Sequence, residues 1–147
     1  MGEGMKYNAK QEMELISRIL TPDIMISPLN YVLFAFPWGK EGTPLARKKG
    51  PRKWQREELE KIAKHNLENQ CRINRGENPI PYNLAIASGR GIGKSAIFAW
   101  ITLWAMSSRI GCTVIITANT EQQLRSRTWA ELGKWHTLAI NSHWFER

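Results

Sequence analysis

The chain has no apolar run long enough to cross a lipid bilayer, and it contains few cysteines. Its longest apolar stretch, residues 96–106 with Thr102 as the only interruption, is far shorter than the roughly 20 residues that a membrane-spanning helix needs. Its two cysteines, Cys71 and Cys112, have no cysteine or histidine at the spacing of a metal site, which disfavours both a zinc site and a structural disulfide. The N-terminal residues do not form a secretory signal. These absences predict a cytosolic globular protein that is not secreted.

Acidic residues are scarce as well. The 147 residues include 13 Asp and Glu against 21 Lys and Arg, a net charge of +8 that favours a polyanionic partner such as nucleic acid. Six cations stand close together ahead of Glu57: Arg47, Lys48, Lys49, Arg52, Lys53 and Arg56. We call the first five of them the basic arm. Two interpretations of the basic arm remain open. It is either a solvated loop and helix start, or a surface that contacts the phosphates of nucleic acid.

Glycines gather at one place, where they form a phosphate-binding pattern. The stretch Ser88-Gly89-Arg90-Gly91-Ile92-Gly93-Lys94-Ser95 lies between two apolar runs. It matches the P-loop pattern, which is Gly, four residues and Gly-Lys-Ser/Thr, except that Ser88 stands at the first glycine. In such a loop, backbone N–H groups and the start of a helix hold a triphosphate. Lys94 would reach the β- and γ-phosphates, and the Ser95 hydroxyl would coordinate Mg²⁺.

Two other interpretations of this loop are weaker. The spacing of Gly89, Gly91 and Gly93 does not match the Gly-x-Gly-x-x-Gly turn of dinucleotide-binding folds. If the turn contained Lys-Ser only by chance, there would be no reason to expect a short apolar strand before it and a strongly helical run after it, and the chain has both. The sequence therefore favours a nucleoside triphosphate with Mg²⁺.

Apolar periodicity predicts the elements around the loop. Helices are expected over residues 9–20, 52–70, 96–106 and 121–135, the last with Thr120 and Gln123 in a capping box. Short buried strands are expected over residues 82–87 and 112–118, and a strand, helix and strand in this order imply a right-handed crossover. The expected fold class is therefore α/β, a partial P-loop NTPase with a parallel sheet flanked by helices. A helix and an irregular arm over residues 23–51 precede it.

Several motifs, taken together, resemble the N-terminal ATPase part of the terminase large subunits of tailed phages, which package DNA into procapsids. The motifs are Phe36-Pro37-Trp38-Gly39, Gly50-Pro51-Arg52-Lys53-Trp54-Gln55, Ser88 to Ser95, and Val114 to Leu124. The resemblance covers roughly residues 31–145 and rests on the order and spacing of these motifs. The chain then divides into an N-terminal helix and arm, residues 1–50, and the first part of a helicase-like P-loop ATPase domain, residues 51–147.

The resemblance implies roles for individual residues. Trp54 and Gln55 match a segment that recognises adenine, with Gln55 at the base edge. Arg90 matches a cation that stabilises charge on the γ-phosphate, so Lys94 and Arg90 are the implied catalytic residues; the alternative for Arg90 is a solvated loop cation. The remaining implied ATP-binding residues are Ser88, Gly89, Gly91, Ile92, Gly93 and Ser95, with Ser95 on Mg²⁺. The implied DNA contacts are the basic arm with Thr120, Gln123 and Arg125.

The resemblance also implies partners: double-stranded DNA, a small terminase subunit, a portal and procapsid, and a ring-shaped homo-oligomer in the bacterial host cytoplasm. Hydrolysis needs an acid at the end of an apolar strand to hold Mg²⁺, and a second acid to activate water. The strand expected over residues 112–118 runs into Asn119 without an acid. We therefore expect a chain that binds ATP, does not hydrolyse it alone, and forms the first part of a longer motor. Two alternatives stay open: part of a helicase-like DNA-dependent ATPase, or a basic nucleic-acid-binding module with a vestigial P-loop.

Overall fold

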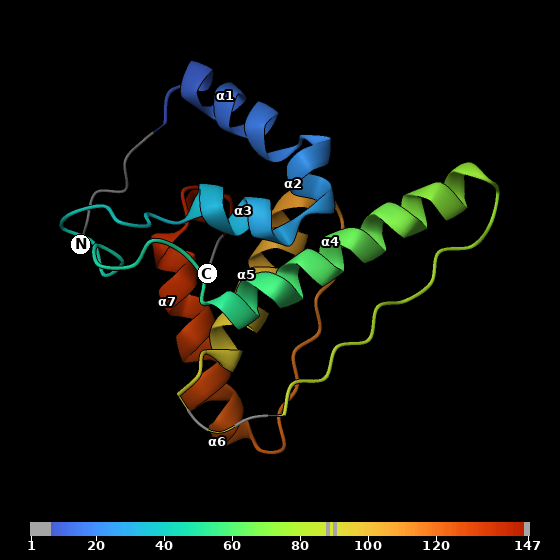
Figure 1. The fold of residues 1–147 in the computed structure, drawn as a ribbon. Helices are drawn as coiled ribbons and strands as arrows, with labels where there is room; N and C mark the ends of the chain where they lie inside the picture. The colour runs from blue at the N-terminus through green and yellow to red at the C-terminus, as the bar shows by residue number, and fades with distance from the viewer. Residues whose placement is uncertain (1–6, 88, 90, 146–147) are drawn as a thin grey trace.

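The computed structural model describes residues 7–87, 89 and 91–145, and every regular element within them is a helix (Figure 1). In chain order these are α1 (Ala9–Ile19), α2 (Pro22–Ile26), α3 (Pro28–Ala35), α4 (Lys53–Asn74), α5 (Lys94–Ser108), α6 (Glu121–Gln123), a π-helical segment (Leu124–Trp129), α7 (Ala130–Leu138) and a 3₁₀ turn (Ser142–Trp144). Among these described elements, no helix is long and apolar enough to cross a membrane. The helices predicted over residues 9–20, 52–70 and 96–106 are confirmed as α1, α4 and α5.

Polar caps begin the three helices on the N-terminal side. Asn8 and Gln11 exchange side-chain and backbone hydrogen bonds at 2.9 and 3.0 Å, which forms a capping box at the start of α1. Thr21 and Ser27 cap α2 and α3, and in each case proline occupies the first helical position, where its missing N–H costs nothing. The prediction of an irregular arm is therefore wrong over residues 23–35, because Pro22 and Pro28 each begin a helix.

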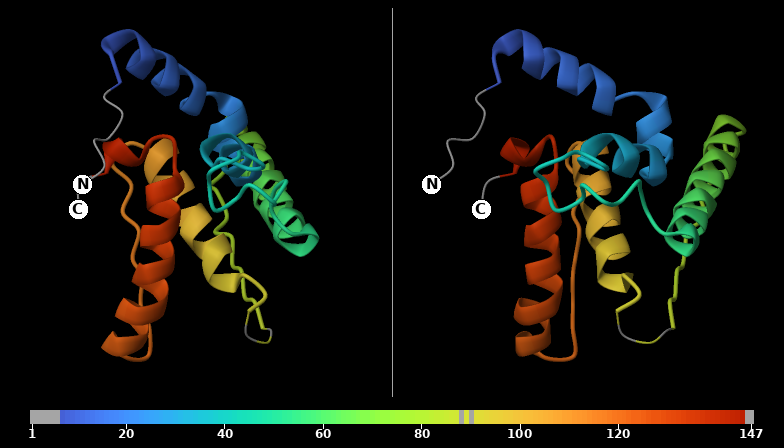
Figure 2. Two further views of the ribbon diagram at one scale, coloured as in Figure 1. Left: turned by 90° about the vertical axis from the view of Figure 1, so that its left-hand side faces the viewer. Right: turned by 60° about the vertical axis from the view of Figure 1, so that its left-hand side comes forward.

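The core lies around α5, which packs against α3 and α7. Ile97 and Trp100 of α5 are at most 2% exposed. Trp100 meets Trp135 of α7 edge to face, with ring centroids 5.0 Å apart, and α3 contributes Tyr31 and Val32, both 0% exposed. In both views of Figure 2, α5 lies between α7 and α4. This nearly all-apolar helix therefore lies at the centre of the fold.

The predicted α/β fold class is wrong, since residues 7–87, 89 and 91–145 contain no strand and no sheet. Residues 81–87 and 112–118 are extended, but α5 lies between them in both views of Figure 2, so they do not pair with each other. The prediction that residues 112–118 form a buried strand is also wrong, because Ile115 is 83% exposed. A β-branched sequence favours an extended backbone, whereas a sheet also needs a neighbouring strand to complete its hydrogen bonds.

The helix predicted over residues 121–135 is confirmed, and it continues to Leu138. Thr120 Oγ1 accepts a hydrogen bond from the Gln123 backbone N–H at 3.2 Å, so the predicted cap is present. The middle of this helix, Leu124–Trp129, has π-helical winding, which sequence periodicity does not reveal. One extra residue per turn rotates the following α7 relative to α6, and Trp135 then points into the core.

Candidate nucleotide-binding loop

The predicted phosphate-binding loop joins the extended segment 81–87 to the N-terminus of α5. Gly91 and Gly93 have φ angles of +79° and +92°, a left-handed conformation that glycine adopts without steric cost. Gly93 is the N-cap of α5, and its carbonyl oxygen accepts a hydrogen bond from the Ile97 N–H at 3.3 Å. Ser88 and Arg90, both predicted site residues, lie outside the described residues. The described part of the loop is thus a tight turn followed directly by a helix.

Side chains at the start of α4 form hydrogen bonds with the backbone of this loop. Gln55 Nε2 donates a hydrogen bond to the Gly93 carbonyl oxygen at 3.0 Å, and Gln55 Oε1 accepts one from the Arg52 backbone N–H at 2.9 Å. The Arg52 guanidinium donates to the Gly91 carbonyl oxygen at 3.3 Å. Gln55 is only 4% exposed. The structure therefore brings the Trp54-Gln55 segment and the glycine-rich loop together, because the Gln55 amide donates to the loop backbone. The implied contact of Gln55 with an adenine base stays a prediction.

The side chain of Trp54, the residue before Gln55, points towards the hydrophobic core. Its half-buried ring packs against the hydrophobic core. Its indole N–H is buried and has no hydrogen-bond acceptor among the described residues. This side chain joins α4 to the core, and its implied role in adenine recognition also stays a prediction.

The start of α5 is electropositive and partly open. The first N–H groups of a helix have no acceptors within the helix, and the aligned peptide dipoles place positive partial charge there. Ile92 and Lys94 are half-buried, whereas Gly89 and Ser95 are exposed. Ser95 lines a groove of about 480 Å³ between α5 and residues 114–117. A phosphate group fits this arrangement, which combines backbone N–H groups, a hydroxyl and a lysine charge.

The side chains at this groove that could supply oxygen ligands to a metal ion are hydroxyls. Besides Ser95, the groove is lined by Thr102, Thr117 and Thr128, and its described lining contains no carboxylate. The described part of the chain has no group of three or more His, Cys, Asp or Glu that could hold a metal ion. Mg²⁺ commonly keeps several waters and binds through few protein oxygens together with phosphate oxygens. The residues therefore fit a Mg²⁺ ion that arrives with a triphosphate.

The basic arm lies beside the loop. All five of its side chains are exposed: Arg47, Lys48, Lys49, Arg52 and Lys53. Arg52 connects the arm to the loop through Gly91, and Lys53 lies 3.9 Å from the carboxylate of Glu57 in a mostly exposed ion pair. Within the arm, Arg52 thus places a positive charge directly on the loop.

The other predicted DNA contacts lie elsewhere. Thr120 caps α6, Gln123 is exposed, and the Arg125 guanidinium pairs with Glu121 at 2.8 Å. In both views of Figure 2, the N-terminus of α5 lies between α6 and the start of α4. The structure therefore does not bring Thr120, Gln123 and Arg125 onto the basic arm.

The chain matches no family model, no curated protein and no solved structure. No relative therefore transfers a ligand, an activity or a partner to it. Functional proposals for this chain rest on its own residues and on the resemblance that its motifs carry.

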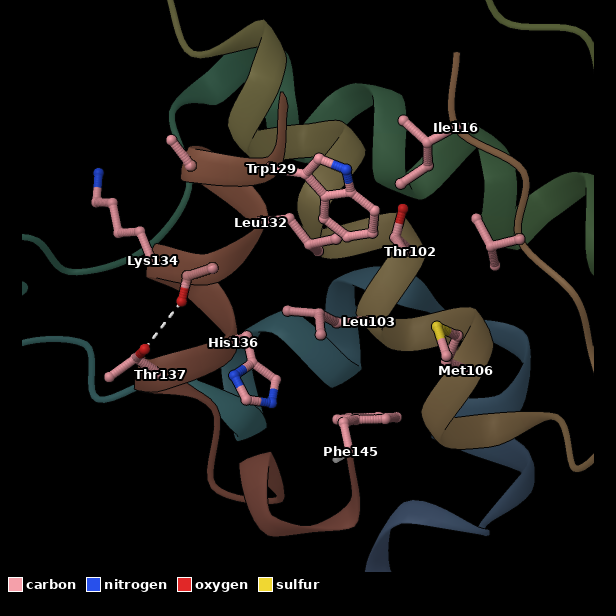
Figure 3. Close-up of a pocket in the computed structure, with 13 residues that line it drawn as sticks. Thr102, Leu103, Met106, Ile116, Trp129, Leu132, Lys134, His136, Thr137 and Phe145 are labelled. Atoms are coloured by element: carbon pink, nitrogen blue, oxygen red, sulfur yellow. Dashed lines mark hydrogen bonds between the residues drawn. The ribbon is translucent and has the colours of Figure 1, made fainter. Parts of the chain in front are cut away.

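A wider groove that the sequence did not predict adjoins the groove at Ser95 and shares Thr102, Val114, Ile116 and Leu132 with it. It measures about 970 Å³ and is lined by α5, α7 and the extended segment at Val114 and Ile116. Figure 3 shows Leu103 of α5 facing Trp129 and Leu132 across it. Its polar lining residues are Thr102, Lys134, His136 and Thr137. No sequence motif marks this groove, because its lining comes from four separate segments: residues 102–106, 114–116 and 129–137, and Phe145.

No sequence motif predicts the buried polar cluster that Tyr31, Ser107 and Asn141 form. The Tyr31 hydroxyl donates to Asn141 Oδ1 at 3.0 Å, Asn141 Nδ2 donates to Ser107 Oγ at 2.8 Å, and Ser107 Oγ lies 3.2 Å from the Tyr31 oxygen. Burial raises the pKa of Tyr31 to about 12, against the lowering effect of its hydrogen bonds with Ser107 and Asn141. The cluster ties α3, α5 and the C-terminal residues together, and its members are too far apart in sequence to suggest a contact.

A second cluster fastens α1 to the C-terminal residues. Glu12 accepts hydrogen bonds from Trp144 Nε1 and from His143 Nε2, the latter at 2.7 Å, and the Tyr7 ring stacks on His143 with centroids 4.6 Å apart. Desolvation raises the pKa of Glu12, but the hydrogen bonds from His143 and Trp144 and the charge of His143 outweigh it, so the net shift is downward. The ionised carboxylate is therefore the form that holds α1 in place.

Proposed function

We propose that residues 88–95 bind the phosphates of ATP, and that the chain is the ATP-binding part of a DNA-packaging motor of the terminase large-subunit type. The observation that carries this proposal is the attachment of Gln55 and Arg52 to the loop backbone at Gly93 and Gly91. These two segments are 38 positions apart in sequence, and both were assigned to one nucleotide site from their motifs alone.

The proposed binding mode follows from the loop geometry. The turn at Gly91 and Gly93 directs the chain into α5, whose N-terminus attracts anions. Lys94 supplies a point charge for the β- and γ-phosphates, and the Ser95 hydroxyl supplies an oxygen for the accompanying Mg²⁺. Gln55 acts as a positioning residue, since it holds the Gly93 carbonyl in place. ATP hydrolysis and DNA translocation belong to the complete motor in this proposal.

The test is a titration of the protein with a fluorescent ATP analogue in the presence of Mg²⁺. Lys94→Ala should weaken binding roughly 10- to 100-fold, because a hydrogen bond to a charged phosphate contributes about 1.5–3 kcal/mol. Lys64→Ala is the matched control, since Lys64 is an exposed lysine on α4 and its loss changes the net charge equally. Equal affinities of the Lys94→Ala variant and the native protein would reject the nucleotide site.

The exposure of the basic arm favours a second function, binding to the phosphates of nucleic acid. Five exposed cations beside the loop can displace counterions from DNA, so binding should weaken steeply with salt. Replacing Arg47, Lys48 and Lys49 with glutamine should reduce both the affinity for double-stranded DNA and the slope of its salt dependence. If DNA binding is abolished and ATP binding is unchanged, the arm acts as an independent nucleic-acid module. If ATP also changes the DNA affinity, the packaging-motor proposal is favoured.

The remaining implied properties belong to the same proposal. A terminase-type motor works in the cytoplasm of the bacterial host, as a ring of identical subunits with a small terminase subunit and a portal. Copurification of this chain with a portal or small subunit from infected cells would support that assembly. A helicase-like DNA-dependent ATPase is the alternative, and unwinding of a duplex by the complete motor would favour it.

A further inference from the structure

The Trp54-Gln55 segment presents little surface to the base of a nucleotide. Gln55 is 4% exposed, and both ends of its amide are engaged, since Nε2 donates to the Gly93 carbonyl at 3.0 Å and Oε1 accepts from the Arg52 N–H at 2.9 Å. The Trp54 ring packs against the core, and its indole N–H is buried. A base that used either side chain would first have to displace these contacts.

The two grooves beside α5 offer a different place for the base. The narrow groove of about 480 Å³ begins at Ser95, and it meets the wide groove of about 970 Å³ at Thr102, Val114, Ile116 and Leu132, which line both. Ser95 and Thr102 are seven residues apart (102 − 95 = 7), so they lie on one face of α5, roughly 10 Å apart along its axis. This span matches a ribose with its base attached. Phosphates at the start of α5 therefore leave the base at the junction of the grooves.

The wide groove offers an aromatic ring at this junction. Trp129 lines the groove and is 53% exposed. Figure 3 shows Leu103 of α5 on the opposite side, facing Trp129 and Leu132. Trp129 is the last residue of the π-helical segment, a winding that is found frequently at functional sites. An exposed indole ring in an apolar groove is a surface on which a planar base stacks.

The polar side chains of the wide groove are engaged with their own neighbours. The hydroxyls of Thr102 and Thr137 each donate to a carbonyl of their own helix at 2.9 Å. Lys134 Nζ lies 3.7 Å from a carboxylate of α7, and His136 Nε2 lies 3.1 Å from a backbone carbonyl oxygen. The groove therefore recognises the flat faces of a base and does not read the hydrogen-bonding groups at its edge.

We propose that the base of the bound nucleotide stacks on Trp129 in the wide groove, so that one ligand occupies the loop and both grooves. This inference rests on the proposed nucleotide-binding function, and it assigns the base to Trp129 in place of the Trp54-Gln55 segment. Because recognition is by stacking, the site takes purine nucleoside triphosphates as a class and accepts adenine and guanine alike.

Isothermal titration of the native protein with three ligands tests the base site. ATP, GTP and inorganic triphosphate are compared with Mg²⁺ in about 0.15 M salt, which screens non-specific attraction to the positive net charge. ATP and GTP should bind within roughly 10-fold of each other, because no polar group reads the base edge. Both should bind roughly 5- to 100-fold tighter than triphosphate, the contribution of one stacked base.

Each other result of this titration has a distinct meaning. Equal affinities for ATP and triphosphate would overturn the base site and leave the phosphate site standing. Discrimination between ATP and GTP beyond roughly 10-fold would show that the edge is read, and would overturn the stacking mode. No binding of any of the three ligands would reject the proposed function itself, and the base site with it.

Two substitutions at Trp129 separate the base site from the phosphate site. Trp129→Ala should weaken ATP binding roughly 5- to 100-fold and leave triphosphate binding unchanged, whereas Lys94→Ala should weaken both. Trp129→Phe retains a stacking ring and should restore most of the ATP affinity. Tyr82→Ala is the matched control, because Tyr82 is an aromatic residue that is 37% exposed and lies outside both grooves. Unchanged ATP binding by Trp129→Ala, or an equal loss of triphosphate binding, would contradict the assignment.

Discussion

Gly93→Ala is the substitution that tests the junction between the loop and α4 most directly. Gly93 has a φ angle of +92°, and a Cβ atom at this position would lie 2.5 Å from Gln55 Nε2. The left-handed backbone costs alanine about 1–2 kcal/mol. Gln55 must also move, and its hydrogen bonds to Gly93 and Arg52 contribute about 0.5–1.5 kcal/mol each. The expected loss is therefore about 2–5 kcal/mol of the free energy of unfolding.

A double-mutant cycle separates the two contributions. In a Gln55→Ala background the collision is absent, so Gly93→Ala should cost only the backbone strain of about 1–2 kcal/mol. The difference, about 1–3 kcal/mol, is the coupling between the two residues and is measurable by urea denaturation. Gly76→Ala is the matched control, since Gly76 has a φ angle of +77° and no atom within 4 Å of the added Cβ. Equal costs of Gly93→Ala in both backgrounds would refute the contact between Gln55 and the loop.

Three further predictions concern stability. Tyr31→Phe should lower the free energy of unfolding by about 1–3 kcal/mol, because the buried Asn141 Oδ1 loses its hydrogen-bond donor; an unchanged urea midpoint would contradict this. The pKa of Tyr31 is raised from 10.0 to about 12, so the native protein should lose stability as pH rises through this window, and Tyr31→Phe should lose less. The pKa of Glu12 is lowered from 4.5, so its contribution is complete above 4.5 and disappears as pH falls below it. Thermal melts of Glu12→Gln and native protein should differ at neutral pH and converge in acid, and a constant difference would exclude the ionised carboxylate as the cause. Leu59→Ala should cost about 2–5 kcal/mol, because the Leu59 side chain is 0% exposed.

Helices were predictable from sequence because their signals are local. Met13, Ile16 and Ile19 repeat at helical spacing within α1, and the cap at Thr120 identifies the start of α6. The apolar run of α5 likewise predicts its helix. The arm was harder to predict, since Pro22 and Pro28 can end one helix or begin the next, and only the caps at Thr21 and Ser27 decide between these outcomes.

The absence of a sheet from the described residues was not predictable from the same information. Val114, Ile115 and Ile116 favour an extended backbone, and the structure has one there. Whether such a segment becomes a strand depends on a partner distant in sequence, which its own residues do not specify. The attachment of Gln55 to Gly93 was anticipated only as shared membership of one site, and the cluster of Tyr31, Ser107 and Asn141 left no local signal at all.

The fastening of α1 to the C-terminal residues has a consequence for the order in which the protein folds. The Tyr7 hydroxyl donates to the Ile140 carbonyl, the Ile140 N–H donates to the Ala35 carbonyl at 2.8 Å, and Glu12 binds His143. During synthesis on the ribosome, α1 emerges first, yet these contacts become available only after residues 140–144 have emerged. Earlier in synthesis α1 can contact α2 and, through Arg18 over the Phe34 ring at 4.5 Å, α3. Its amide protons should therefore exchange faster in nascent chains that end before Ile140 than in the complete chain.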